Sequence, residues 1–259
     1  MPPFVLIAPA SRGLSRALTR YYLRTTSLPV YATHRSTDDA SVRASILADL
    51  PDVDHERVRL LHMELTSEDS IADAAQQLKQ SFDAKDGAYI HTAFFTGAVL
   101  HPERQPADLD ATNIAQTFAT NVTSHLLCIK YFSQFLPGPR AANTTDAPAK
   151  WVHVSARVGS VSDNRLGGWY AYRASKAALN QVIRTFDIHL QNKRARAMCV
   201  GVHPGTVKTD LSKDFWGGVP KEKLFEPEYA AELLAGVVGG LKTAQRGRVW
   251  DWAGKEVVP

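Results

Sequence analysis

The feature that most constrains the fold is an alternation of short apolar runs with helical patterns along almost the whole chain. The apolar runs have the length of strands and lack polar alternation, which is typical of strands buried on both faces of a parallel sheet. We expect strands at 4–8, 29–34, 58–63, 87–92, 151–155, 197–202 and 247–252, and helices at 14–22, 39–50, 67–82, 108–135, 170–191 and 227–241. Right-handed crossovers make this a doubly wound α/β fold with a mostly parallel sheet of seven strands.

The size of the chain suits one undivided domain of this kind. It has 259 residues, of which 44% are hydrophobic and 22% charged, so it can bury an apolar core. No long linker interrupts the alternation, and we therefore expect a single domain over residues 1–259. In such a sheet, ligands bind at the carboxyl ends of the strands.

The composition argues against several classes of protein. A net charge of +4 on scattered residues is too small for a nucleic-acid-binding surface, so we expect no nucleic-acid partner. No apolar run reaches the roughly 20 residues of a membrane span, so we expect no membrane partner. Cys128 and Cys199 are the two cysteines and form no CxxC motif, so we expect neither a metal site nor a disulfide framework. A reducing, cytoplasmic location is the simpler interpretation.

Residues 1–37 contain five arginines and no acidic residue, which is also typical of a mitochondrial transit peptide. The same residues read as the first strand and helix of the fold, and that interpretation leaves no segment to be cleaved. Both interpretations stay open on the sequence.

The sharpest chemical signal is Tyr172 with Lys176, at the start of the long expected helix. Residues four apart lie on one helical face, so the ammonium group can lower the pKa of the phenol from about 10. Such a phenol can protonate a carbonyl oxygen as hydride reaches the carbon. Ser155 ends an expected strand, and we expect its hydroxyl beside the phenol. The alternative is a solvated lysine on an exposed helical turn.

Asn121 lies within an expected helix, where a buried amide is mildly unfavourable unless it serves a purpose or marks a kink. With this residue the pattern resembles the short-chain dehydrogenase/reductase family. The residues that carry the resemblance are Asn121, Ser155, Tyr172, Lys176 and the stretch 203–209. Segments 155–172 and 250–254 resemble the C-factor-like and sniffer-type carbonyl reductase branch of that family.

The resemblance implies a Rossmann-type domain and a role for each of these residues. Tyr172 is the general acid and base, and Lys176 binds the nicotinamide ribose and depresses the pKa of the phenol. Ser155 binds the substrate oxygen, and Asn121 holds a water that relays protons. The cofactor-binding residues it implies are Ser11, Arg12, Gly13, Leu14, Arg35, Glu64, Leu65, Ala93, Tyr172, Lys176, Pro204, Gly205, Val207 and Thr209.

The loop after the first expected strand departs from the family pattern Thr-Gly-x-x-x-Gly-x-Gly. This chain reads Ala8-Pro9-Ala10-Ser11-Arg12-Gly13-Leu14-Ser15, so only the glycine at position 13 survives. Pro9 fixes φ near −65° and removes an amide, whereas Ser15 is small enough to be tolerated. The following helix N-terminus can still bind a phosphate through its free amides.

A second departure lies at the end of the fourth expected strand. The family has Asn-Asn-Ala-Gly where this chain has His91-Thr92-Ala93-Phe94, so we expect Phe94 where a glycine borders the cofactor. Two hypotheses follow from these departures. The chain is an NADPH-dependent reductase with a remodelled cofactor site, or it is a non-catalytic binding or signalling protein.

The cofactor type follows from charge. The second expected strand ends without an acidic residue, and Arg12 and Arg35 fit the 2′-phosphate of NADP(H) better than the free hydroxyl of NAD(H). The alternative is that both are ordinary surface arginines. Glu64 and Leu65 occupy the Asp-Val position that the family places near the adenine.

The substrate is expected to be a small carbonyl compound or alcohol. Residues 203–226 are the expected substrate loop, because Phe215 and Trp216 beside two glycines suit a lid that closes an apolar pocket. Trp169 could line the same pocket, and inward-packed aromatic residues in a surface loop are the alternative. The family resemblance implies a homodimer or homotetramer that pairs through 108–135 and 170–191.

Overall fold

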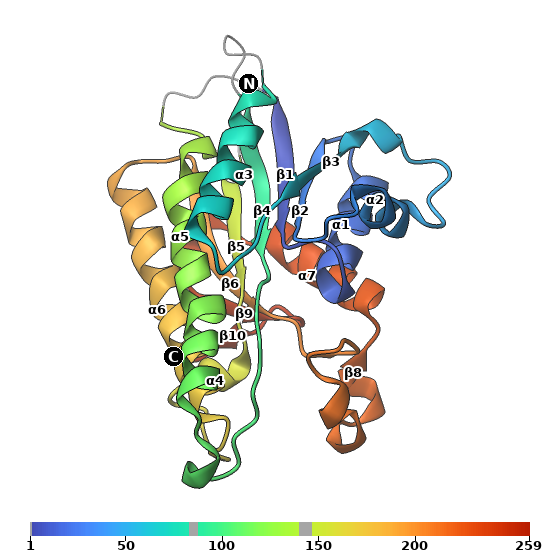
Figure 1. Cartoon of the computed structure of the whole chain (residues 1–259). Coiled ribbons are helices and arrows are strands. Elements are labelled where there is room, and N and C mark those ends of the chain that lie inside the picture. Colours follow the sequence, from blue (N-terminus) through green and yellow to red (C-terminus); the bar gives the residue numbers. More distant parts are fainter. Residues whose placement is uncertain (1, 83–87, 140–146) are drawn as a thin grey trace.

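The computed structural model describes residues 2–82, 88–139 and 147–259, and within these ranges one sheet of eight strands forms the centre of the molecule (Figure 1). Its strand order is β10-β9-β6-β5-β4-β1-β2-β3. The strands are β1 (Pro3–Ala8), β2 (Val30–His34), β3 (Val58–His62), β4 (Tyr89–Phe95), β5 (Ala149–Val154), β6 (Ala197–His203), β9 (Val249–Asp251) and β10 (Glu256–Val257). All neighbours are parallel except β9 and β10. The expected doubly wound fold is confirmed, with the two-residue β10 as an additional edge strand.

Seven helices of the described ranges cover the two faces of the sheet (Figure 1). One face carries α1 (Gly13–Thr25), α2 (Asp39–Leu47) and α7 (Pro227–Gly240), and the other carries α3 (Glu68–Gln80), α4 (Ala111–Phe118), α5 (Ser124–Phe132) and α6 (Tyr170–Asn192). Successive strand residues point to opposite faces, so Leu6 belongs to one buried apolar cluster and Ile7 to the other. Continuous apolar runs are therefore required, because both faces of each central strand are buried.

The fourth strand lies later in the chain than the sequence predicts. The expected range was 87–92, and Gly87 lies outside the described residues, but β4 continues to Phe95. Phe94 is fully buried and its ring centroid lies 5.9 Å from that of Tyr22. The expectation that Phe94 borders the cofactor is wrong, because two successive phenylalanines extend the strand into the core beyond Thr92.

The expected helix at 108–135 is divided. A π-helical turn at Ala119–Thr123 separates α4 from α5, and Asn121 lies in the middle of this turn. π-Helical turns of this kind occur frequently at functional sites. The turn shifts the helical phase, so residues after it face the sheet differently from those before it.

The connections fix where a ligand can bind. The chain leaves β1 toward α1 on one face and leaves β4 toward α4 on the other, and β1 and β4 are neighbours in the sheet. A crevice beyond the carboxyl ends of two such strands is the usual ligand site of a doubly wound sheet. A separate two-stranded pair, β7 (Thr206–Val207) and β8 (Leu224–Phe225), extends past the same edge. None of the helices in the described ranges has the length and apolar character that crossing a membrane requires.

Candidate active site

The first turns of α6 bring Tyr172 and Lys176 together at the carboxyl edge of the sheet, as the sequence predicts. Both side chains are buried, and the Lys176 Nζ lies 5.7 Å from the centroid of the Tyr172 ring. Lys176 Nζ donates a hydrogen bond to the Val154 carbonyl at 3.0 Å, whereas the Tyr172 hydroxyl has no hydrogen-bond partner among the described residues. The phenol is therefore free to contact a bound molecule.

Burial controls the protonation of this pair. It raises the pKa of the Tyr172 phenol to about 12 and lowers the pKa of the Lys176 amine to about 7, because each charged form would lose its hydration. The expectation that the lysine depresses the pKa of the phenol is wrong for this structure, in which desolvation outweighs the nearby amine. At neutral pH the phenol carries its proton and can act as a proton donor.

Ser155 does not lie where the sequence analysis placed it. Its Oγ donates a hydrogen bond to Asn180 Oδ1 at 2.6 Å, and the residue is 2% exposed. Asn180 follows Tyr172 by eight residues, which corresponds to about 12 Å along a helix axis. The Ser155 hydroxyl is thus bonded away from the phenol, and Ala156, the next residue, has no hydroxyl to replace it.

Asn121 connects α6 to the segment that follows β4. Its Oδ1 accepts a hydrogen bond from Val99 N at 2.8 Å, and its Nδ2 donates to Val99 O and to Ser175 Oγ, both at 3.0 Å. Ser175 Oγ in turn donates to the Tyr172 carbonyl at 2.7 Å. Both N–H groups of the fully buried amide are therefore used by the protein, and the role in holding a water stays a prediction.

The N-terminus of α1 keeps the features that a phosphate group needs. Arg12 is the N-cap residue and makes no side-chain cap, and the first turn contains no acidic residue. Gly13 has φ +52°, and a Cβ there would lie 2.9 Å from Thr209 Cγ2. The free amides of this turn and the positive end of the helix dipole can bind an anion, so the loop fits the pyrophosphate of a dinucleotide.

Hydrogen bonds stabilise this loop where the family has glycines. Ser15 Oγ lies 2.7 Å from Thr96 Oγ1, and Thr96 Oγ1 donates to the Pro9 carbonyl at 3.2 Å. The Thr96 amide also donates to the Ala8 carbonyl at 2.8 Å. Thr96 thus joins the loop after β1 to the segment after β4, and Ser15, which replaces a glycine of the family pattern, adds a contact from α1 to the same residue.

Gly97 is a residue of this site that the sequence analysis missed. A Cβ at this position would lie 2.3 Å from Leu65 Cδ1 and 3.7 Å from Pro9 Cδ, so a larger residue would require the Leu65 side chain to move. Ala93, which we expected to contact the cofactor, is instead fully buried inside β4, because the strand ends later than expected. In the sequence, the dipeptide Thr96-Gly97 after two phenylalanines could have indicated the end of the strand and the position of Gly97.

Charged and polar groups gather at the carboxyl ends of β2 and β3. Arg35 Nη1 lies 3.3 Å from Glu64 Oε2 at the surface, while the Arg12 guanidinium makes no ion pair with a described residue. Two buried groups lack hydrogen-bond partners in the described chain, the Thr33 hydroxyl and the His34 ring, although His34 Nε2 lies 3.3 Å from Asp39 Oδ1. Neither Thr33 nor His34 was singled out by the sequence.

The remaining predicted cofactor residues follow β6. Pro204 and Gly205 form the turn after this strand, Val207 packs with Phe225 in a small apolar cluster, and Thr209 lies against Gly13. The structure thereby brings the segment after β6 next to the loop after β1, as the resemblance implies.

Aromatic side chains link Tyr172 to the expected lid. The ring of Trp169 lies 6.1 Å from that of Tyr172 and 4.8 Å from that of Phe215, which belongs to the 3₁₀ segment Lys213–Gly218. Trp169 has φ +49°, and its amide donates to the Glu103 carbonyl at 2.6 Å. Both carboxylate oxygens of Glu103 are buried without a hydrogen-bond partner in the described chain, which no sequence pattern indicated.

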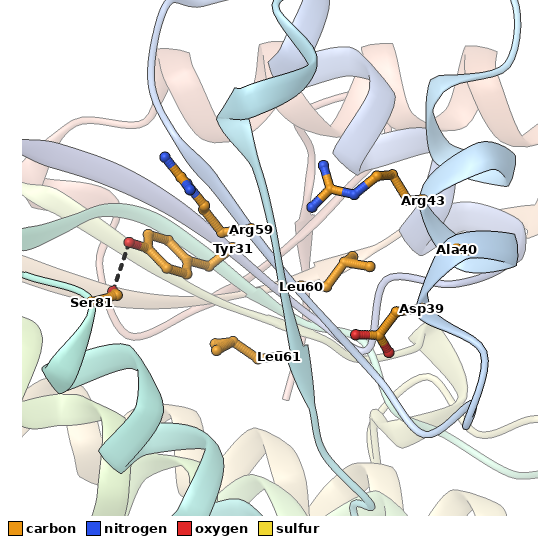
Figure 2. Close-up of a pocket in the computed structure, with 8 residues that line it drawn as sticks. All are labelled: Tyr31, Asp39, Ala40, Arg43, Arg59, Leu60, Leu61 and Ser81. Carbon is orange, nitrogen blue, oxygen red and sulfur yellow. Dashed lines mark hydrogen bonds between the residues drawn. The ribbon is translucent and has the colours of Figure 1, made fainter.

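A cavity of about 520 Å³ lies away from these residues, beside the edge strand β3 (Figure 2). It is lined by Tyr31, Asp39, Ala40, Arg43, Arg59, Leu60, Leu61 and Ser81. β3 and β5 are four strand positions apart in the sheet, or about 19 Å at the usual spacing. This cavity is therefore separate from the Tyr172 site. Within the described ranges, no group of three His, Cys, Asp or Glu side chains could hold a metal ion.

A doubly wound sheet with a buried tyrosine and lysine at its carboxyl edge defines a Rossmann-type protein with a candidate proton-transfer site. Residues 3–218 match the model of the short chain dehydrogenase family, and the chain belongs to that family. The family prediction from the sequence is thus confirmed.

Two relatives and two solved structures illustrate the likeness. The chain is 36% identical over 150 residues to the C-signal of Myxococcus xanthus, covering 58% of this chain and 81% of that protein. It is 30% identical over 186 residues to the 1-hydroxy-2-glutathionyl-2-methyl-3-butene dehydrogenase of Rhodococcus sp. (strain AD45), covering 72% and 74%. The carbonyl reductase Sniffer of D. melanogaster superposes with a TM-score of 0.84 at 20% identity, covering 100% of both chains. An NADPH-bound carbonyl reductase from chicken fatty liver gives 0.82 at 22% identity, covering 99% and 98%.

Proposed function

We propose that this protein is an NADP(H)-dependent oxidoreductase that reduces a ketone or aldehyde, with Tyr172 as the general acid. The observation that carries the proposal is the hydroxyl of Tyr172, a buried residue beside Lys176 at the carboxyl edge of the sheet; this hydroxyl has no partner among the described residues. Membership of the short chain dehydrogenase family supports oxidoreductase chemistry at this site.

In the proposed reduction, Tyr172 supplies the proton and Lys176 contacts the cofactor. When bound, a reduced nicotinamide supplies the hydride. Tyr172 gives its proton to the carbonyl oxygen, which becomes the hydroxyl of the product, and a proton from solvent restores the phenol. A protonated Lys176 has three donors, of which the Val154 carbonyl uses one, so two stay available for ribose hydroxyls.

Several features support NADP(H) as the cofactor. Arg12 offers a guanidinium without an ion-pair partner in the described chain, at an uncapped helix N-terminus. Arg35 is the second cation of this region; it is exposed and makes one ion pair in the described chain, with Glu64 at 3.3 Å, so its other guanidinium nitrogens can still reach a 2′-phosphate. Solved structures of similar fold include an NADPH-bound carbonyl reductase from chicken fatty liver and a short-chain dehydrogenase/reductase from Burkholderia multivorans with bound NADP. The residues we propose to hold the cofactor are Ser11, Arg12, Gly13, Leu14, Arg35, Glu64, Leu65, Tyr172, Lys176, Pro204, Gly205, Val207 and Thr209.

For the substrate, we propose a small apolar carbonyl compound held under a lid formed by residues 203–226. The contact of Phe215 with Trp169, and of Trp169 with Tyr172, supports an apolar wall beside the phenol. Because Ser155 is bonded to Asn180, we propose that Tyr172 polarises the substrate oxygen without help from that hydroxyl.

The single domain over 1–259, the cytoplasmic location and the homodimer or homotetramer stay predictions. Exposed apolar side chains on three helices of one face support self-association: Phe118 on α4, Leu126 on α5 and Ile188 on α6. The oligomeric state can be measured directly by light scattering of the purified chain.

The proposal is tested by titrating the protein with NADPH and following the fluorescence of its five tryptophans. We expect saturable binding in the range of roughly 1 μM to 1 mM that is usual for enzyme substrates. Aromatic and aliphatic ketones and aldehydes are then offered, and consumption of NADPH is followed by its absorbance. Binding without turnover of any carbonyl compound would contradict the catalytic part of the proposal.

The second candidate is a non-catalytic binding or signalling protein of the same fold. It is favoured by the position of Ser155, whose hydroxyl is bonded to Asn180, and by the loss of two glycines from the loop after β1. Absence of NADPH binding at millimolar concentration would favour this candidate over the reductase.

A further inference from the structure

A buried pair of histidines lies beneath the active site and takes no part in the proposed chemistry. His125 of α5 and His153 of β5 face each other, with their Nδ1 atoms 2.8 Å apart. Trp151 Nε1 lies 2.9 Å from His153 Nε2, and His125 Nε2 lies 3.0 Å from the carbonyl oxygen of Gly97. Both histidines are almost fully buried.

The hydrogen-bond partners determine where each proton lies. An indole N–H can only donate, so His153 Nε2 must accept, and the proton of the neutral His153 ring lies on Nδ1. That proton is donated to His125 Nδ1, which leaves the His125 proton on Nε2. His125 therefore donates to the Gly97 carbonyl. In this series of three hydrogen bonds, from Trp151 through His153 and His125 to Gly97, each ring nitrogen has a partner.

Two residues one helical turn apart thus hold the segment that leaves β4. Asn121 binds both the amide and the carbonyl of Val99, and His125 binds the carbonyl of Gly97. Gly97 lies between Pro9 of the loop after β1 and Leu65, just beyond the carboxyl end of β4. The position of this short segment consequently affects the packing between the loop after β1 and the segment after β3.

We propose that His125 is a positioning residue of the dinucleotide site: by donating from Nε2 to Gly97, it fixes the wall that a bound cofactor contacts. The inference rests on the proposed binding of NADP(H). The ring keeps this single donor because it stays neutral. Burial, together with the nearby charge of Lys176, lowers the pKa of His125 to about 3.

Two substitutions separate positioning from stability. In His125→Gln, the amide nitrogen can take the place of Nε2 and donate to Gly97, but the acceptor for His153 is lost. In His125→Asn, the amide oxygen can take the place of Nδ1 and accept from His153, but the donor to Gly97 is lost. Each variant gives up one buried hydrogen bond, so both are expected to melt at a similar, lower temperature than the unchanged protein.

Three measurements on each variant test the proposal: the melting temperature, the dissociation constant for NADPH, and deuterium uptake of backbone amides at 96–100 without cofactor. We expect His125→Asn to bind NADPH about tenfold more weakly and to exchange faster at 96–100. His125→Gln should stay close to the unchanged protein in both, despite its similar loss of stability.

Equal affinities in the two variants, or affinities that follow the melting temperature alone, would overturn the role of His125 while leaving the proposed cofactor intact. If the unchanged protein does not bind NADPH, the proposed function fails and the positioning role fails with it. In that case, faster exchange confined to His125→Asn would still identify the contact to Gly97 as a structural one.

Discussion

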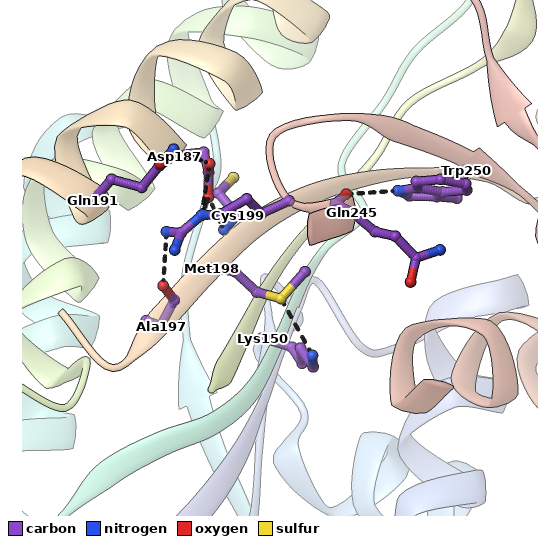
Figure 3. Close-up of polar contacts among 9 residues, drawn as sticks. Lys150, Asp187, Gln191, Ala197, Met198, Cys199, Gln245 and Trp250 are labelled. Atoms are coloured by element: carbon purple, nitrogen blue, oxygen red, sulfur yellow. Dashed lines mark hydrogen bonds and ion pairs between the residues drawn. The ribbon is translucent and has the colours of Figure 1, made fainter. Parts of the chain in front are cut away.

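The two ends of α6 bury polar side chains in opposite ways. At the beginning of the helix, the Tyr172 hydroxyl has no hydrogen-bond partner in the described chain, and the Lys176 amine donates to a single carbonyl, that of Val154. Toward its end, the Asp187 carboxylate is fully buried and accepts from the Cys199 amide at 3.0 Å, from Arg246 Nε at 2.9 Å and from Gln191 Nε2 at 2.9 Å (Figure 3).

The two ends of α6 therefore differ in what their buried polar groups do: those near Asp187 bind one another, and those near Tyr172 are left for a ligand. Arg246 also donates to the Ala197 carbonyl at 3.0 Å, so the Asp187 cluster joins α6, β6 and the segment before β9. Removing one partner of a buried ion pair destabilises the fold, because the other charge is then left uncompensated. The groups at the other end of α6 are left open, which costs stability unless a ligand completes them. We therefore expect substitutions at the two ends to change different quantities.

The largest effect is expected for Tyr172→Phe. It removes the proton donor and little else, so kcat for carbonyl reduction should fall by about 10²–10⁴. Affinity for NADPH and the melting temperature should change little, because the hydroxyl has no partner among the described residues. The measurement is steady-state reduction together with fluorescence titration. An unchanged kcat would remove Tyr172 from the mechanism.

At the other end of the helix, Asp187→Ala should lower the free energy of unfolding by about 3–5 kcal/mol, because Arg246 loses its partner in a buried site. Activity per folded molecule should be retained. Urea unfolding measures the effect, and Glu232→Ala, on the exposed side of α7, is the matched control, with an expected change within about 0.5 kcal/mol. A similar small change for both variants would refute the stabilising role of the cluster.

The pH dependence of the reaction rates tests the protonation state of the Tyr172 phenol. With a pKa of about 12, the phenol is protonated at neutral pH, which is the form that reduction needs. Oxidation of the alcohol needs the deprotonated form. At pH values below the pKa, the fraction of this form rises about tenfold for each unit by which the pH increases. The ratio of oxidation rate to reduction rate should therefore rise steeply between pH 6 and pH 9. We would measure initial rates in both directions, and a constant ratio would contradict the role of the phenol.

The smallest effect is expected for Ser155→Ala. Because its hydroxyl donates to Asn180, the substitution should cost about 1 kcal/mol of stability and change kcat far less than Tyr172→Phe does. Asn180→Ala, which removes the other partner, should have a comparable effect on unfolding. A loss of kcat as large as that of Tyr172→Phe would mean that Ser155 reaches the substrate after all.

Local patterns in the sequence were sufficient for the architecture. The apolar runs and the helices between them predict the order of the elements, because strands buried on both faces need continuous apolar sequence. The spacing of Tyr172 and Lys176 places them on one helical face whatever the surroundings. Gly13 could be recognised because the turn before a phosphate-binding helix end needs a glycine.

Tertiary structure decided what these residues do. The end of β4 was misplaced because nothing local distinguishes two buried phenylalanines in a strand from two in a loop. The partner of Ser155 lies on another element, 25 residues further along the chain, and the partners of Asn121 and His125 lie 54 and 28 residues further along. The direction of the pKa shift at Tyr172 depends on burial, which only the packed fold creates. The sequence by itself thus determined the elements and the pairing of Tyr172 with Lys176, while long-range packing set the partners and the protonation of these side chains, since both depend on contacts that no local pattern encodes.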